Sequence, residues 1–165
     1  MTKHDLTLIS GKGGIATPDD VFEARHLIDG AWQASASGEN FTRHCPATGQ
    51  LVTRASLGGG VEVNAAVAAA RRAFDDRRWS DTSGRDRATL LAKVADLIDA
   101  NRPRIALYET MESGKPISQA MAEIEGAADI WRYAASLART IHGESHTTLG
   151  PDMLGLVLKE PIGVV

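Results

Sequence analysis

The last seven residues constrain this chain more than any other segment. They read KEPIGVV, a charged pair and a proline followed by Ile and Val, which is typical of a β-strand. Each such side chain left in water forgoes about 1.5 to 3 kcal/mol of burial energy. We therefore expect residues 161–165 to begin a sheet whose other strands lie beyond this sequence, so that the chain is the front portion of a larger fold.

Composition argues against several classes of function. The chain has 18 Lys and Arg residues and 21 Asp and Glu residues, and its net charge of −3 provides no basic field to hold a nucleic acid. No apolar run approaches the roughly 20 residues that span a bilayer, and the start lacks the apolar core of a secretory signal. Cys45 is the only cysteine, so no internal disulfide can form. We expect a cytoplasmic protein that binds neither nucleic acid nor membranes.

The first part of the chain reads as an arm followed by a small β-element. Residues 1–25 form the expected flexible N-terminal arm, because their polar, glycine-rich start shows no period. Residues 27–32, LIDGAW, place Asp-Gly between apolar flanks and predict a tight β-hairpin. The PATG turn at 46–49 leads into a strand candidate at 51–55.

Helical periodicity dominates the middle of the chain. An alanine-rich apolar stripe predicts a first helix over about 61–76. Ser83 opens a second helix with a capping-box pattern. Pro103 interrupts that helix or starts a short successor that stops at Gly114, and a third long helix is expected to end near Gly143. The side chains that the second helix is expected to bury are Leu90, Leu91, Val94, Leu97 and Ile98.

A second hairpin is expected near the end of the chain. Two short apolar runs flank a Gly-Pro-Asp turn, which predicts a β-hairpin between Thr147 and Leu158. The expected organisation is α/β, with one unit at 26–146, the hairpin at 147–160 and the strand at 161–165.

Four local patterns suggest chemistry, and each also has a structural explanation. Cys45 precedes Pro46 in a loop, without a helix N-terminus to lower its pKa, so we interpret it as structural. His142 and His146 have the i, i+4 spacing of a zinc pair, but Gly143 is expected to break the helix between them. The Gly-Lys pairs at 11–14 and 113–116 lack the spacing of a phosphate-binding loop.

Two carboxylates on the third helix leave one functional alternative open. Glu123 and Glu125 lie beside apolar residues, where carboxylates usually form a solvated face. The alternative places Glu123 near a substrate entrance, where it would attract a cationic group.

From about His26 to Val165 the sequence resembles the N-terminal part of the aldehyde dehydrogenase superfamily, because several motifs occur in the family's order. The motifs are LIDGAW at 27–32, PATG at 46–49, the helix at 65–74, ADLI at 95–98, ET at 109–110, SGKP at 113–116, RYA at 132–134, HGE at 142–144 and KEPIGVV at 159–165. The resemblance implies a β-hairpin, three long helices, the start of an oligomerisation hairpin and the start of the cofactor-domain sheet, a fold that is incomplete as it stands.

The resemblance also implies the chemistry of a complete enzyme. A cysteine thiolate adds to an aldehyde, hydride passes to NAD or NADP, and a glutamate-activated water hydrolyses the acyl-enzyme while an asparagine and a backbone N–H stabilise the oxyanion. None of these residues maps onto this chain, so we assign no catalytic, cofactor-binding or metal residue. We expect the chain alone to be inactive and to bind neither cofactor.

The sequence departs from the family pattern at two positions. Cys45 stands where the family usually has Asn, and Glu112 stands where Asp is common. In some members that Asp, with backbone oxygens near the positions of Arg43 and His44, helps to hold a monovalent cation, so the longer Glu112 puts that site in question. Residues 143–148 and 153–165 look most like amino-aldehyde enzymes such as those of γ-aminobutyraldehyde, and Glu123 matches a position that is acidic in some of them.

The hairpin between Thr147 and Leu158 resembles the protruding strands that pair with another subunit in this family. Its exposed N–H and C=O edges predict pairing with a full-length subunit or with a second copy. A rival interpretation is a non-catalytic interaction module that binds full-length aldehyde dehydrogenase subunits. An unrelated helical domain would require the ordered motifs to be coincidence.

Overall fold

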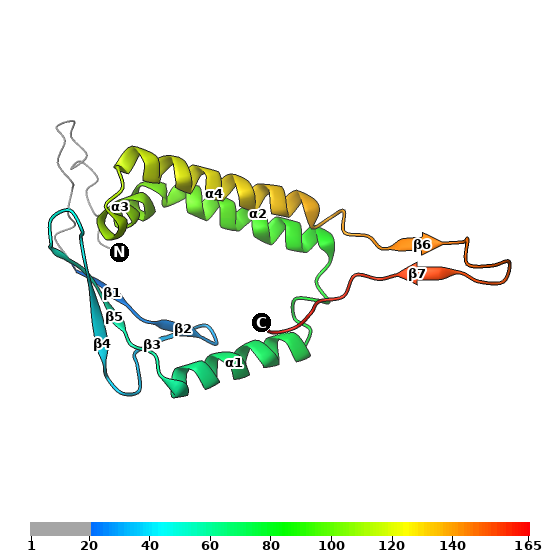
Figure 1. Ribbon diagram of the computed structural model, residues 1–165, viewed down its shortest axis with the longest axis horizontal. Helices are drawn as coiled ribbons and strands as arrows, with labels where there is room; N and C mark the ends of the chain where they lie inside the picture. Colours follow the sequence, from blue (N-terminus) through cyan, green and yellow to red (C-terminus); the bar gives the residue numbers. More distant parts are fainter. Residues whose placement is uncertain (1–20) are drawn as a thin grey trace.

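The computed structural model describes residues 21–165, so the expected arm lies almost entirely outside the described residues. Five short strands come first along the chain, four helices follow and two further strands come last, a mixture of helix and sheet that agrees with the expected α/β class (Figure 1). The elements are β1 (Phe22–Ala24), β2 (His26–Ile28), β3 (Ala31–Gln33), β4 (Asn40–His44), β5 (Leu51–Ser56), α1 (Gly60–Asp75), α2 (Gly84–Ala100), α3 (Arg102–Ser113), α4 (Ile117–Leu137), β6 (Glu144–His146) and β7 (Gly155–Val157).

The N-terminal β-element contains two small sheets. The predicted hairpin is present as β2 and β3, and its turn residues Asp29 and Gly30 have φ of 52° and 77°, as a tight Asp-Gly turn requires. The second sheet has the order β1-β5-β4, with β1 parallel and β4 antiparallel to β5. The expected arm extends to residue 25, but ordered structure already begins at β1, which pairs with β5. Because β5 is distant in the sequence, no local pattern reveals this contact.

Helices α2, α3 and α4 pack closely along rows of alanine. Ala95, Ala106, Ala120 and Ala128 are fully buried. Small side chains let helix axes approach, and this explains why the larger side chains of α2 are not the buried ones. The expectation that α2 buries Leu90 and Leu97 is wrong, since they are 50% and 63% exposed. Leu91, Val94 and Ile98 are half-buried.

The helix ends follow their predicted signals, with one exception. The Ser83 hydroxyl accepts a hydrogen bond from the Asp86 N–H at 3.1 Å at the start of α2. Pro103 lies in the first turn of α3, and Gly114 ends α3 in the left-handed region at φ 77°. Helix α4 ends at Leu137, before Gly143, because the following residues tighten into a turn with Thr140 N–H donating to the Leu137 carbonyl.

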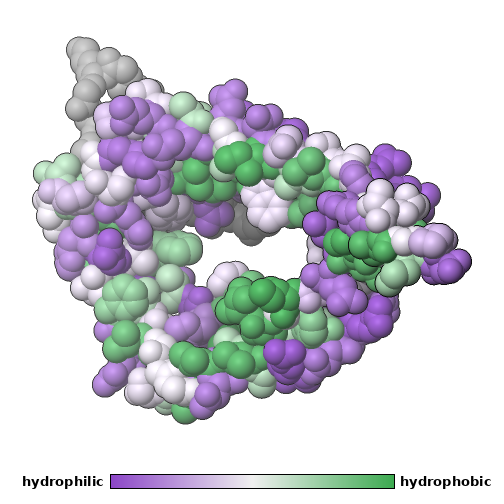
Figure 2. Space-filling view, turned by 45° about the vertical axis from the view of Figure 1, so that its right-hand side comes forward, coloured by the Kyte–Doolittle hydropathy of each residue, from purple (hydrophilic) through white to green (hydrophobic). Residues whose placement is uncertain are grey.

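The elements surround an opening rather than a continuous core. Figure 1 shows α1 on one side and the α2–α4 group on the other, joined by the strands at one end, with the C-terminal segment between them. Figure 2 shows that this opening passes through the molecule and that hydrophobic residues border it. Large apolar side chains of α1, α2 and α4 are exposed, among them Val63, Leu97 and Ile130. Such extended apolar surface is typical of a face that another chain segment or partner covers.

The end of the chain differs from expectation in two ways. The hairpin is present, but its strands β6 and β7 place its start at Glu144 rather than at residue 147. Residues 161–165 form no strand, because a strand needs a hydrogen-bonded neighbour and none of the described residues pairs with this segment. The segment instead runs past α1, where Gly163 lies near Arg71 and Phe74. Within residues 21–165, no helix combines the length and the apolar character needed to cross a membrane.

A buried carboxylate fixes the start of α1. Glu62 accepts hydrogen bonds from the backbone N–H groups of Ala36 and Gly59, both at 2.7 Å. These two bonds, with the Ala36 bond contributing most, lower the pKa of Glu62 below its ordinary value of 4.5. The loop after β3 and the first turn of α1 are therefore held together by one side chain.

Removing two methyl groups from the small core should destabilise the chain. Val52 is 1% exposed and packs with Cys45 and Met111, so Val52→Ala should lower the free energy of unfolding by about 2 kcal/mol in urea titrations followed by circular dichroism. Val63→Ala is the matched control, because Val63 is 58% exposed on a helix. If both substitutions lowered the free energy of unfolding equally, the core packing of Val52 would be contradicted.

Glu62 predicts a pH-dependent stability. Since its pKa is lowered in the folded state, the ionised carboxylate stabilises the fold fully above pH 4.5 and less as pH falls through the folded pKa. The difference in free energy of unfolding between the natural chain and Glu62→Gln should be larger at pH 7 than at pH 3. Glu39→Gln, at an exposed carboxylate without a partner among the described residues, is the matched control and should change the free energy of unfolding at pH 7 less than Glu62→Gln does. A pH-independent Glu62→Gln difference would refute the role of the ionised carboxylate.

Candidate functional site

The β6–β7 hairpin is exposed along most of its length. It projects away from the helices (Figure 1), and its register pairs Glu144 with Val157 and Ser145 with Leu156. Neither strand has a neighbour on its outer edge among the described residues. Its exposed large apolar side chains are Leu149, Met153, Leu154, Leu156, Val157 and Leu158. A two-stranded ribbon with open edges and apolar side chains is suited to pairing with another strand.

Glu123 lies in an ion-pair cluster. Lys115 Nζ is 2.6 Å from Glu123 Oε2 and 2.8 Å from Glu109 Oε1. The two carboxylates, Glu109 first, raise the pKa of Lys115 above its ordinary value, so the lysine stays charged. Glu125 pairs instead with Arg102 at 2.8 Å. A cationic group approaching Glu123 would have to compete with Lys115.

Cys45 is enclosed in the small core and does not face solvent. It packs with Val52 and Met111 and is 1% exposed. A hydrogen bond with the Thr48 side chain, and lesser ones with the backbone of Ala47 and Thr48, lower the pKa of the Cys45 thiol although burial acts in the opposite direction. A thiol without access to solvent cannot attack a substrate, which supports the structural interpretation.

Glu112 has a partner of its own in the same region. Thr53 Oγ1 donates a hydrogen bond of 2.5 Å to Glu112 Oε1. Thr53 is buried on β5, and its Cα is paired with that of Arg43 on β4. One carboxylate oxygen of Glu112 is thus already engaged at the position where the family resemblance would place a cation.

The two histidines do not converge on a common point. His142 Nδ1 donates to the Thr140 carbonyl at 2.6 Å, whereas His146 lies on β6 with Nε2 3.6 Å from Glu144. Across residues 21–165, no group of three or more His, Cys, Asp or Glu side chains is arranged to hold a metal ion.

Sequence reasoning missed the ionic contacts that join separate elements. Asp99 accepts from Arg132 at 2.6 Å and from Arg102 at 2.9 Å, and Arg132 lowers the pKa of Asp99 most. This carboxylate therefore links α2, α3 and α4. Charges 33 residues apart give no sequence signal, because their proximity depends on how the helices pack.

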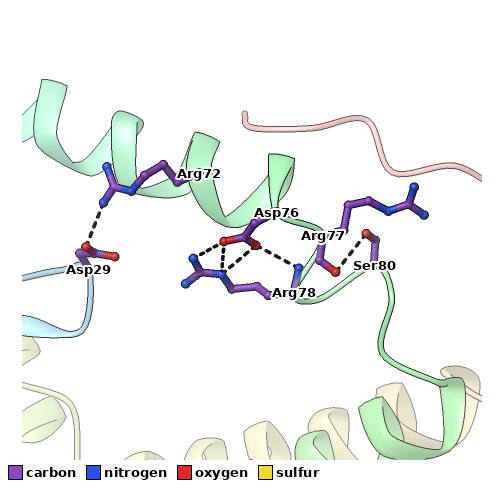
Figure 3. Close-up of polar contacts among 6 residues, drawn as sticks. All are labelled: Asp29, Arg72, Asp76, Arg77, Arg78 and Ser80. Atoms are coloured by element: carbon purple, nitrogen blue, oxygen red, sulfur yellow. Dashed lines mark hydrogen bonds and ion pairs between the residues drawn. The ribbon is translucent and has the colours of Figure 1, made fainter.

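A second ionic contact joins the first hairpin to α1. Figure 3 shows Asp29 of the β2–β3 turn facing Arg72 of α1, and their charged groups lie 2.9 Å apart. Just after α1, the Nε–H of Arg78 donates to both carboxylate oxygens of Asp76, each at 2.9 Å, and Arg78 lowers the pKa of Asp76 to about 2. These pairs are exposed, so they orient the elements more than they stabilise them.

Comparison with known proteins adds the family. Residues 32–165 match the aldehyde dehydrogenase family. The NADP/NAD-dependent aldehyde dehydrogenase PuuC of Escherichia coli is 35% identical over 144 residues, which are 87% of this chain and 29% of that protein. The aminoacetaldehyde dehydrogenase of Pseudomonas aeruginosa is 34% identical over 142 residues, covering 86% of this chain and 28% of that protein.

Solved structures agree in fold. The NAD-dependent aldehyde dehydrogenase of Sinorhizobium meliloti superposes with a TM-score of 0.82 at 42% identity, covering 88% of this chain and 31% of that one. The betaine aldehyde dehydrogenase of Staphylococcus aureus, solved with NAD+, has a TM-score of 0.74 at 30% identity and covers 78% and 25%. The chain thus spans about three tenths of the relatives it matches. Its strands and helices form the N-terminal part of their fold, and the chain belongs to the aldehyde dehydrogenase family.

Proposed function

We propose that this chain is the N-terminal portion of an NAD(P)-dependent aldehyde dehydrogenase and that it supplies scaffold and subunit contacts but no catalytic residue. The observation behind the proposal is the combination of a family match over residues 32–165 with coverage of only 29% of the E. coli relative. The uncovered apolar surface of α1, α2 and α4 supports it, because this surface suits a scaffold that packs against further structure.

In the complete enzyme we propose oxidation of an aldehyde to a carboxylate with NAD or NADP as the hydride acceptor. The E. coli relative is an NADP/NAD-dependent aldehyde dehydrogenase and the S. meliloti relative an NAD-dependent one, which supports this cofactor class. We propose that the chain by itself binds neither cofactor, since the glycine motif that the family resemblance assigns to cofactor binding does not map onto this sequence. An absence of membrane-crossing helices in residues 21–165 is compatible with the proposed cytoplasmic location.

The proposed substrate class is small amino aldehydes. The named activities of the P. aeruginosa relative and of the aminoaldehyde dehydrogenase 2 of Zea mays support this class. Glu123 stays the proposed substrate-entrance residue, and its pairing with Lys115 means that any attraction for a cation comes from the surplus negative charge of the Glu109–Lys115–Glu123 cluster.

A second candidate function rests on the hairpin. With open edges and exposed apolar side chains, β6 and β7 would let the chain act as a non-catalytic interaction module that pairs with full-length subunits. Both functions use the same hairpin, and they differ in whether the catalytic residues belong to the same polypeptide.

We expect the purified 165-residue chain to oxidise no aldehyde. With γ-aminobutyraldehyde or acetaldehyde and NAD or NADP, absorbance at 340 nm should not rise above that of buffer, because no nucleophile is accessible on the described residues. A mock purification from the same host excludes contaminating enzymes. Turnover above both backgrounds would overturn the proposal that this portion lacks catalytic residues.

We expect the hairpin to drive association of the chain. Leu156→Glu places a charge on the exposed face of β7 and should weaken self-association at least tenfold in sedimentation equilibrium, since buried unpaired charge opposes strand pairing. Gln119→Glu, which adds a charge at an exposed polar residue of α4, is the matched control and should change association less than twofold. Equal weakening by both variants would argue against the hairpin as the contact.

A further inference from the structure

A pocket at the base of the hairpin gathers positive charge in a chain that is acidic as a whole. It has a volume of about 550 Å³ and lies where the start of α2, the end of α4 and the root of β6–β7 meet. Its charged lining comprises Arg87, Arg139, Lys159 and Glu160, with His142 alongside. Three cations against one carboxylate leave two positive charges, although the whole chain carries −3.

The three cations have no ion-pair partner in the described part of the chain. Arg87, Arg139 and Lys159 form no ion pair with any carboxylate in residues 21–165. The Arg87 Nε atom is buried, yet it has no hydrogen-bond partner among the described residues. Buried donors normally have an acceptor, so a guanidinium without one indicates a missing partner.

Two close backbone approaches bring these side chains together. A Cβ at Gly84 would lie 2.6 Å from the Ala138 carbonyl oxygen, so the start of α2 and the end of α4 meet at a distance that only glycine allows, and Arg87 and Arg139 line the pocket at this junction. A Cβ at Gly143 would clash with the Val157 carbonyl oxygen, so the two sides of the hairpin approach closely at its root, shortly before Lys159. The pocket is therefore built by packing contacts rather than by mobile surface side chains alone.

We propose that this pocket binds a small phosphate-bearing anion. Guanidinium groups present planar arrays of N–H donors that match phosphate oxygens, and an ammonium adds a compact charge. The cations come from three separate segments, namely α2, the residues after α4 and the residues after β7, so a ligand in the pocket can be contacted by all three, which suits the several oxygens of a tetrahedral oxyanion. The volume accommodates a phosphate group with a small organic portion.

Titration of the 165-residue chain with inorganic pyrophosphate at low ionic strength tests the proposal. Isothermal calorimetry should give a saturable single site, and the Arg87 Nε–H resonance should shift with the same midpoint. Arg87→Gln should weaken binding at least tenfold. Arg85→Gln is the matched control, because Arg85 is two residues away, exposed and paired with Asp86, and it should stay within twofold.

A second variant protects the test from loss of folding. If circular dichroism shows that Arg87→Gln is unfolded, Lys159→Gln at the exposed hairpin root should still weaken pyrophosphate binding about fivefold or more. Absence of saturable binding, or equal weakening by Arg85→Gln, would overturn the site. Succinate binding as tightly as pyrophosphate would overturn the assignment to phosphate. None of these readouts depends on aldehyde oxidation, so they are separate from the proposed function.

Discussion

The close packing of α2 against α4 is the contact on which the rest of this structure depends. Alanines at 88, 95, 128 and 135 are buried, and the absence of a side chain at Gly84 lets the start of α2 touch the end of α4. Small residues give up apolar area but allow many backbone and Cβ contacts along two long helices. The β6–β7 hairpin follows α4 directly in the chain, so the packed pair of α2 and α4 sets its position.

This packing also explains why so much apolar surface stays open. Because alanine fills the interface, the larger side chains of α2 point elsewhere, and Leu90 and Leu97 are exposed together with Val63 on α1. Figure 2 shows hydrophobic residues around the opening between the helical groups. Surface of this kind is typical of a face that another segment or partner covers, and the chain spans about three tenths of the length of the aldehyde dehydrogenases it matches.

Charged side chains orient these elements relative to one another. Asp99 joins α2, α3 and α4 through Arg102 and Arg132, and Asp29 joins the first hairpin to α1. Glu62 differs from them, because it is buried and bound by two backbone N–H groups. Of the residues that the sequence suggested for chemistry, Cys45 is in the core and Glu123 is paired with Lys115.

The sequence by itself determined the features that depend on near neighbours. These features include the Asp-Gly turn, the Ser83 cap and the end of α3 at Gly114, because turn and cap preferences act over a few residues. The order of the family motifs could also be read directly from the sequence. Only the tertiary structure decided which helix faces are buried, that β1 pairs with β5, and that residues 161–165 form no strand. Those outcomes depend on partners distant in the chain, which periodicity cannot identify. The cationic pocket around Arg87 belongs to the same class, since its cations meet only after α2, α4 and the hairpin have packed.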